Sequence, residues 1–156
     1  MKKPLKIPYL LFAVAVFSLI FSSCHHDDNR GNSSQNTISA VNNIVTSGTW
    51  RITTYNDSGV DKTNMYSGVS FTFGSNNVLT ALDSGNTING SWSVTDSNSN
   101  DDSPNDLDFN INFSAPPKYA ELSDDWDILG KTNSTIRLVD NSGGNGGTDY
   151  LTFTKN

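Results

Sequence analysis

Residues that could act as a nucleophile or a general base occur together at one place near the start of the chain. Cys24 is the only cysteine, and the only two histidines, His25 and His26, follow it directly. They lie in a polar segment ahead of the regular apolar pattern, so a folded domain downstream has neither residue type for catalysis. Paired imidazoles on such a segment lack the third ligand and the fixed geometry of a tight metal site. We therefore expect no metal and no cofactor.

Carboxylates are the remaining candidates for acid–base chemistry. They group as Asp106 with Asp108, and as Asp124, Asp125 and Asp127 around Trp126. Two such carboxylates could in principle hydrolyse a glycosidic bond. Solvated surface carboxylates give the same pattern more often, and we expect no enzymatic activity.

A stretch of oxygen-bearing side chains from Asp96 to Asp102 begins in the way that a calcium-binding loop does. Its sixth position is Asp101, where the loop of a helix–loop–helix site needs glycine, and its twelfth is Leu107, where that loop needs glutamate. A flexible acidic hairpin tip is the main expectation, and a weak calcium contact is the alternative.

The segment before Cys24 has the organisation of a secretory signal peptide. Three lysines within the first six residues precede 13 residues, Tyr9–Phe21, that are mostly apolar, and two small residues, Ser22 and Ser23, follow. As a helix the apolar run would be too short to cross a bilayer. Cys24 directly after the small residues resembles the lipobox of Gram-negative bacterial lipoproteins, with Phe21 where most carry an aliphatic residue.

The lipobox resemblance implies that residues 1–23 are removed and that Cys24 is lipidated and becomes the mature N-terminus. The alternative is an unmodified cysteine behind an ordinary signal, but a lone cysteine cannot form an internal disulfide. Several acyl chains would anchor the protein stably to the outer membrane. Asp27 and Asp28 resemble the export signal that sends some lipoproteins to the cell surface, although a solvated acidic linker fits them equally well.

Composition indicates one acidic, β-rich domain. Without residues 1–23 the chain has seven basic and sixteen acidic residues, a net charge of −9. Nucleic-acid binding depends on clustered Lys and Arg, so we expect no nucleic-acid partner. Asn accounts for 20 of the remaining 133 residues, which favours turns over helices. This length supports a single core, and we expect a monomer.

The first part of the mature chain predicts a tether and a short helix. Residues 24–40 contain little that could be buried, which predicts a disordered acidic tether. Apolar residues at helical spacing within Thr37–Thr46 predict a short helix packed against the end of a domain that spans residues 41–156.

From Trp50 onward the apolar period changes from 3.6 residues to two. Eight segments alternate apolar with polar residues: 50–55, 69–73, 78–82, 88–94, 107–113, 126–128, 136–138 and 151–153. A helical turn is expected at 118–122 after the Pro116-Pro117 pair. One apolar and one polar face on every strand predicts an all-β fold with antiparallel pairing. We expect an eight-stranded antiparallel up-and-down barrel, with a two-sheet sandwich as the alternative.

Several short motifs in this region resemble a known family. Gly48-Thr49-Trp50 at the first strand resembles the Gly-x-Trp signature of lipocalins. The later strands Phe71-Thr72-Phe73, Gly90-Ser91-Trp92, Trp126-Asp127-Ile128 and Leu151-Thr152-Phe153 are similar in order and spacing to the lipocalin-like domains of bacterial surface lipoproteins. The resemblance implies an eight-stranded barrel in which Trp50 closes one end under a basic residue, either Lys155 or Arg137.

The inward-facing residues allow two functions from different classes. The candidate interior residues are Trp50, Phe71, Phe73, Trp92, Phe109, Ile111, Trp126 and Phe153. In the first hypothesis they line a cavity that carries a small apolar ligand. In the second they fill the barrel, and the protein acts through its surface as an interaction or structural module. A connected void of roughly 300 Å³ or more would favour the carrier.

Overall fold

The computed structural model describes residues 30–96, 107–141 and 147–156, with side chains described from residue 37 onward. Its elements in chain order are α1 (Arg30–Val45), β1 (Trp50–Asp57), β2 (Val60–Asp61), the 3-10 helix η1 (Thr63–Tyr66), β3 (Ser70–Phe73), β4 (Val78–Asp83), β5 (Asn86–Asp96), β6 (Leu107–Asn112), α2 (Pro117–Ala120), β7 (Asp124–Lys131), β8 (Thr135–Asp140) and β9 (Asp149–Lys155). Neither α1 nor any other helix in these ranges is long and apolar enough to cross a bilayer.

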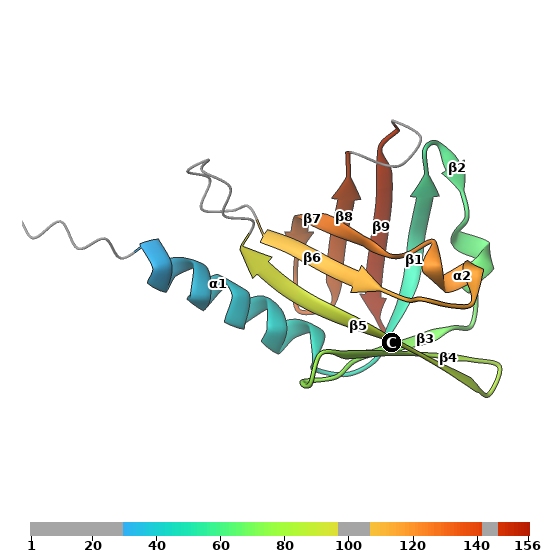
Figure 1. The fold of residues 1–156 in the computed structure, drawn as a ribbon, viewed down its shortest axis with the longest axis horizontal. Helices are drawn as coiled ribbons and strands as arrows, with labels where there is room; N and C mark the ends of the chain where they lie inside the picture. The colour runs from blue at the N-terminus through green and yellow to red at the C-terminus, as the bar shows by residue number, and fades with distance from the viewer. Residues whose placement is uncertain (1–29, 97–106, 142–146) are drawn as a thin grey trace, which may run out of the picture.

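β1 and β3–β9 form a closed antiparallel barrel of eight strands (Figure 1). Each strand from β3 to β8 pairs with the next one along the chain. β1 closes the barrel by pairing with β9, from Trp50 opposite Lys155 to Asn56 opposite Tyr150. The up-and-down barrel predicted from the alternation is confirmed, and the alternative sandwich does not form. Closure pairs the strand edges that an open sheet would expose.

One seam of the barrel is thin. β1 meets β3 at a single residue pair, Trp50 opposite Phe71, and then diverges from it. β2 and η1 cover the edge of β1 that this leaves: Thr63 Oγ1 accepts a hydrogen bond from the Tyr55 N–H at 2.9 Å, and the Lys62 N–H donates to the Tyr55 carbonyl at 2.8 Å. The two-residue strand β2 had no counterpart in the sequence prediction because two residues are too few to show a period.

Two tight turns have the same sequence, Ser-Gly. Ser58 and Gly59 connect β1 to β2, and Ser84 and Gly85 connect β4 to β5, with positive φ angles of 49°, 91°, 51° and 86°. Two consecutive positive φ angles are those of a type I′ turn, whose twist matches that of the flanking strands. The second turn places Asp83 directly opposite Asn86.

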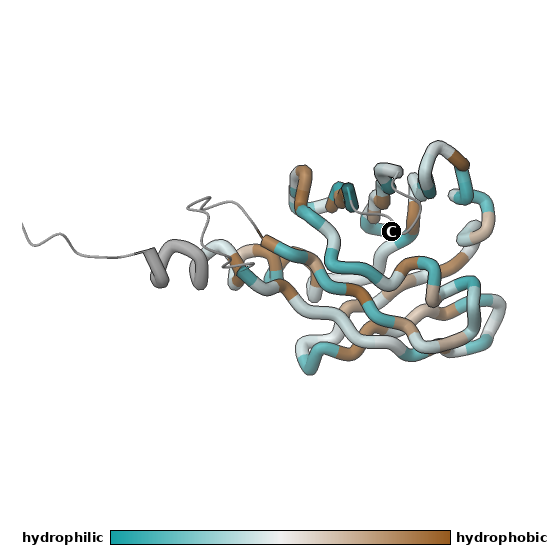
Figure 2. The backbone as a smooth tube through the Cα atoms, turned by 45° about the horizontal axis from the view of Figure 1, so that its top comes forward, coloured by the Kyte–Doolittle hydropathy of each residue, from teal (hydrophilic) through white to brown (hydrophobic). Residues whose placement is uncertain are grey.

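The core occupies the interior of the barrel. Apolar residues alternate with polar ones along the strands (Figure 2), and most of the apolar residues are buried, with Val78, Leu82 and Leu129 among the exposed exceptions. On β6, for example, Leu107, Phe109 and Ile111 are buried, while Asp108 and Asn110 are half-buried on the outer face. One face in and one face out is the register that the alternation predicted.

Helix α1 is longer than the sequence predicted. Val41 and Val45 are fully buried against the barrel, and Ile38 and Ile44 pack beside them, which confirms the predicted helix at 37–46. The helix begins at Arg30, however, so residues 30–40 are helical where a disordered tether was expected. Extending an existing helix costs far less than nucleating one, so the anchored end at Val41 and Val45 lets polar residues before it join the helix. The rest of the predicted tether and the signal segment lie outside the described residues.

Candidate functional site

The structure brings all the candidate interior residues into one buried core. Their exposed fractions are 0% for Trp50, Phe71, Phe109 and Phe153, 1% for Phe73 and Trp126, 3% for Ile111 and 5% for Trp92. Sequence alternation therefore identified the inward side chains on the strands that supply these eight residues. It failed on β4, where Val78 and Leu82 at the ends of the predicted segment 78–82 are exposed and Leu79 and Ala81 are buried instead.

The rings inside the barrel pack directly against one another. Phe73 lies at the centre, with ring-centroid distances of 5.5 Å to Trp92, 5.5 Å to Phe109 and 5.4 Å to Phe153, and all three contacts are edge-to-face. Phe71 makes a further edge-to-face contact with Phe153 at 5.4 Å. These are the separations at which aromatic pairs attract most strongly. These rings therefore form one contiguous cluster inside the barrel.

The three indole N–H groups already have acceptors in the backbone. Trp50 Nε1 donates to the Val45 carbonyl at 2.8 Å, Trp92 Nε1 to the Gly74 carbonyl at 2.9 Å, and Trp126 Nε1 to the Leu122 carbonyl at 3.1 Å. A ligand inside the barrel would find no indole donor to fix its orientation.

Trp50 is covered by a cation, as the lipocalin resemblance implies. Lys155 Nζ lies 5.0 Å from the Trp50 ring centroid and donates to Ser47 Oγ at 2.9 Å. Arg137, the other candidate, is exposed on β8. Gly48 precedes the tryptophan by two residues with a φ of 113°, a conformation that L side chains rarely adopt, so the turn into β1 requires glycine there.

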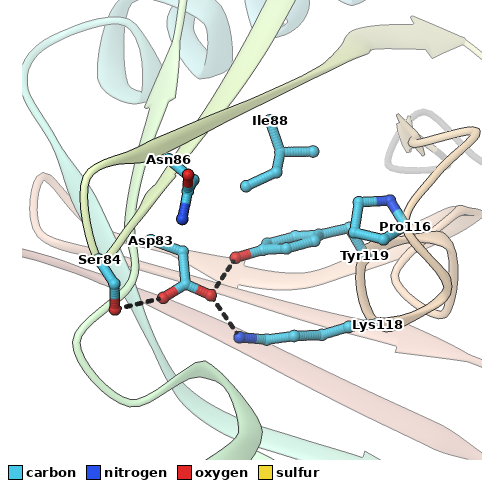
Figure 3. A pocket seen from close by; sticks show the side chains of 7 residues that line it. All are labelled: Asp83, Ser84, Asn86, Ile88, Pro116, Lys118 and Tyr119. Carbon is cyan, nitrogen blue, oxygen red and sulfur yellow. Dashed lines mark hydrogen bonds and ion pairs between the residues drawn. The ribbon is translucent and has the colours of Figure 1, made fainter.

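A cleft of about 480 Å³ lies on the outside of the barrel between the β4–β5 turn and α2. Its walls are Asp83, Ser84, Asn86, Ile88, Pro116, Lys118 and Tyr119 (Figure 3). We call it the hairpin cleft. This volume is within the range of small-molecule sites in proteins.

Asp83 is the centre of the polar network in the hairpin cleft. Its Oδ2 accepts hydrogen bonds from Lys118 Nζ at 2.7 Å and from the Tyr119 hydroxyl at 2.9 Å, and its Oδ1 accepts one from Ser84 Oγ at 3.1 Å (Figure 3). The bonds from Lys118 and then Tyr119 lower the pKa of Asp83 below its usual value. The carboxylate is therefore charged and held in one orientation.

Buried tyrosines fix the α2 segment against the barrel. Tyr66 donates its hydroxyl to the Lys118 carbonyl at 2.5 Å, and Tyr55 donates to the Glu121 carbonyl at 2.7 Å. Burial, the largest cause, raises the pKa of Tyr55 to about 12 and raises that of Tyr66 as well, so both stay protonated donors at neutral pH. Lys62 adds contacts to Glu121 at 2.9 Å and Asp57 at 2.6 Å.

Sequence reasoning missed this cluster of tyrosines and lysines. Tyr66 and Tyr119 lie in η1 and α2, outside the strands whose alternation identified the core. The one available signal was the helical turn expected after Pro116-Pro117, and a four-residue turn has too few positions to show which side chain is buried.

The carboxylates considered for catalysis are distributed along β6 and β7. Asp108 pairs with Asp127 and Asn110 with Asp125 in the strand register, and Asp106 lies outside the described residues. Burial and then a hydrogen bond with Asp125 raise the pKa of Asp124 to about 6.

The acidic stretch after Asp96 also lies outside the described residues, as do Cys24, His25 and His26. In the described ranges no group of three or more His, Cys, Asp or Glu residues is placed to hold a metal ion.

The chain was compared with family models, curated proteins and solved structures. No family model matches the chain, and no curated protein matches it. A search of solved structures matches the chain to that of a DUF4847 family protein from Bacteroides vulgatus ATCC 8482, with 20% sequence identity and a TM-score of 0.46. The match covers 74% of this chain and 97% of that one.

Proposed function

We propose that this protein is a lipid-anchored, non-catalytic module of the Gram-negative outer membrane whose barrel is filled by its own side chains. It acts through its outer surface, as an interaction or structural module, and carries no small apolar ligand in its interior. The observation that supports this most is the aromatic packing around Phe73, whose ring is 1% exposed and touches three other rings.

The size of the barrel supports the same proposal. Eight strands enclose a space just wide enough to be filled by side chains or to hold one small ligand. Here that space contains large rings at 5.4–5.9 Å from their neighbours around Phe73 and Trp92. A carrier would need several of these rings to move aside, each losing its packing contacts.

Native mass spectrometry of the protein purified from its own membrane tests the filled barrel. We expect a monomer with the mass of the processed, acylated chain and nothing else bound. A small apolar molecule that co-purifies in stoichiometric amount would favour the carrier hypothesis and refute the filled barrel.

The proposed anchor rests on the residues around Cys24 and is tested separately. Cells grown with a clickable fatty acid should label the wild-type protein, and the Cys24→Ser variant should take up no label and leave the membrane fraction. Equal labelling of both proteins, or of neither, would contradict a lipid on Cys24.

A further inference from the structure

The hairpin cleft combines a fixed ion pair with an apolar wall and unused polar groups. The β4–β5 turn and α2, which form it, lie on the side of the barrel opposite the N-terminal end of α1 (Figure 1). We propose that this cleft binds a neutral, hydroxyl-rich ligand with one apolar face, the chemistry of a sugar ring.

The charge of the cleft favours a neutral ligand. Asp83 and Lys118 are the charged residues in its wall, and they form an ion pair at 2.7 Å. A charged ligand would face one like and one opposite charge at similar distance, so the two Coulomb energies largely cancel while the ligand still loses its hydration. A neutral ligand avoids that cost.

The polar groups suit hydroxyls. The ammonium of Lys118 has three N–H donors, of which one is directed at Asp83, and it also lies 5.5 Å and 5.2 Å from the ring centroids of Tyr66 and Tyr119. The Asn86 side chain is exposed and has no hydrogen-bond partner among the described residues, so its amide offers both a donor and an acceptor. A hydroxyl group can serve both kinds of partner at once.

The remaining wall is apolar. Ile88 and Pro116 flank the cleft, with Ile88 half-buried and Pro116 exposed, and Ile88 and Asn86 face the Asp83–Tyr119 pair across it (Figure 3). The C–H face of a sugar ring can lie against such a wall while its hydroxyls reach Asn86 and Lys118. This mixture of apolar area with a few fixed polar groups is typical of small-molecule sites.

The site is organised before any ligand arrives. Tyr119 and Ser84 hold the Asp83 carboxylate, and the Tyr66 hydroxyl holds the backbone carbonyl of Lys118. The type I′ turn at Ser84-Gly85 fixes Asp83 opposite Asn86. Groups already held in place lose little further freedom on binding.

Amide chemical-shift titration of the isotope-labelled full chain in detergent tests the proposal. The neutral probes are the methyl glycosides of glucose and galactose. Glucosamine serves as the cationic comparison ligand and glucuronate as the anionic one. We expect saturable shifts at residues 83–88 and 116–119 with at least one neutral glycoside, and weaker binding of both charged sugars.

Asn86→Ala should weaken binding of that glycoside about three- to tenfold, the effect of losing one hydrogen bond. The matched control is Asn133→Ala. Asn133 is exposed and lies between β7 and β8, beside Ser134. The Ser134 carbonyl accepts the Lys155 N–H at the C-terminal end of β9. It should bind like the wild type.

Absence of saturable shifts with every neutral glycoside at tens of millimolar would overturn the proposal. So would tighter binding of glucuronate or glucosamine, or equal weakening by both asparagine variants. Shifts confined to Phe73 and its ring neighbours would refute the filled barrel as well, whereas an unresponsive cleft alone would leave the filled barrel intact.

Discussion

Phe73→Ala measures whether the barrel is filled. The Phe73 side chain is 1% exposed, and burying a phenylalanine contributes about 1.5–3 kcal/mol. Its neighbours Trp92, Phe109 and Phe153 are held by the surrounding strands, so the void left by the ring would collapse only in part. A residual cavity of about 100 Å³ adds roughly 2 kcal/mol. We expect a total loss of about 3–5 kcal/mol in the free energy of unfolding.

Urea unfolding of the purified protein, followed by far-UV circular dichroism and tryptophan fluorescence, gives this difference by linear extrapolation. The control is Leu82→Ala on the outer face of β4, where the side chain is 48% exposed, and its effect should stay within about 0.5 kcal/mol. If Phe73 instead faced an open cavity, its ring would have few contacts to lose. A loss below about 1 kcal/mol for Phe73→Ala would refute the packed interior.

Three further predictions concern separate parts of the barrel. Gly90→Ala places a methyl group against the Asn112 carbonyl and the Phe113 ring, so it should lower the unfolding free energy by about 1–3 kcal/mol in the same urea assay. Gly130→Ala, whose methyl group meets nothing within 4 Å, should be nearly neutral. Asp124 keeps its proton up to about pH 6 when folded and releases it near pH 4 when unfolded, so its contribution to stability falls as pH rises through that window. Asp124→Asn should flatten that fall and, after allowance for solvent screening, raise the free energy of unfolding by about 1 kcal/mol near neutral pH. Thermal unfolding curves measured across this pH range test it, and an unchanged pH profile would contradict it. Lys155→Met should cost about 0.5–2 kcal/mol by removing the cation above the indole, and unchanged stability would show that the contact contributes nothing.

The order of the barrel strands could be read from the sequence. Alternation is a local property, because successive side chains on a strand point to opposite faces. Phe71 and Phe73, or Phe109 and Ile111, therefore identified their buried face without any knowledge of their partners. Gly48 and Trp50 marked the entry to the first strand in the same local way.

The helical boundary could not be read from composition. Residues before Thr37 are polar and predicted a tether, yet α1 begins at Arg30. The difference arises because helix extension depends on the anchored end of the helix, where Val41 and Val45 are buried against the barrel, and that contact is absent from the local pattern.

The sequence by itself determined the class of fold and the inward residues of most strands, since both follow from a period of two along the chain. It did not determine the inward face of β4, or the buried tyrosines of η1 and α2, which lie outside the strands. Only the tertiary structure decided that the rings inside the barrel pack against one another, that Lys155 rather than Arg137 covers Trp50, and that a cleft forms at Asp83. Asp83 and Tyr119 are 36 residues apart in sequence and meet because the barrel brings the β4–β5 turn beside α2. Contacts between such distant residues depend on closure of the whole sheet, which no local pattern records.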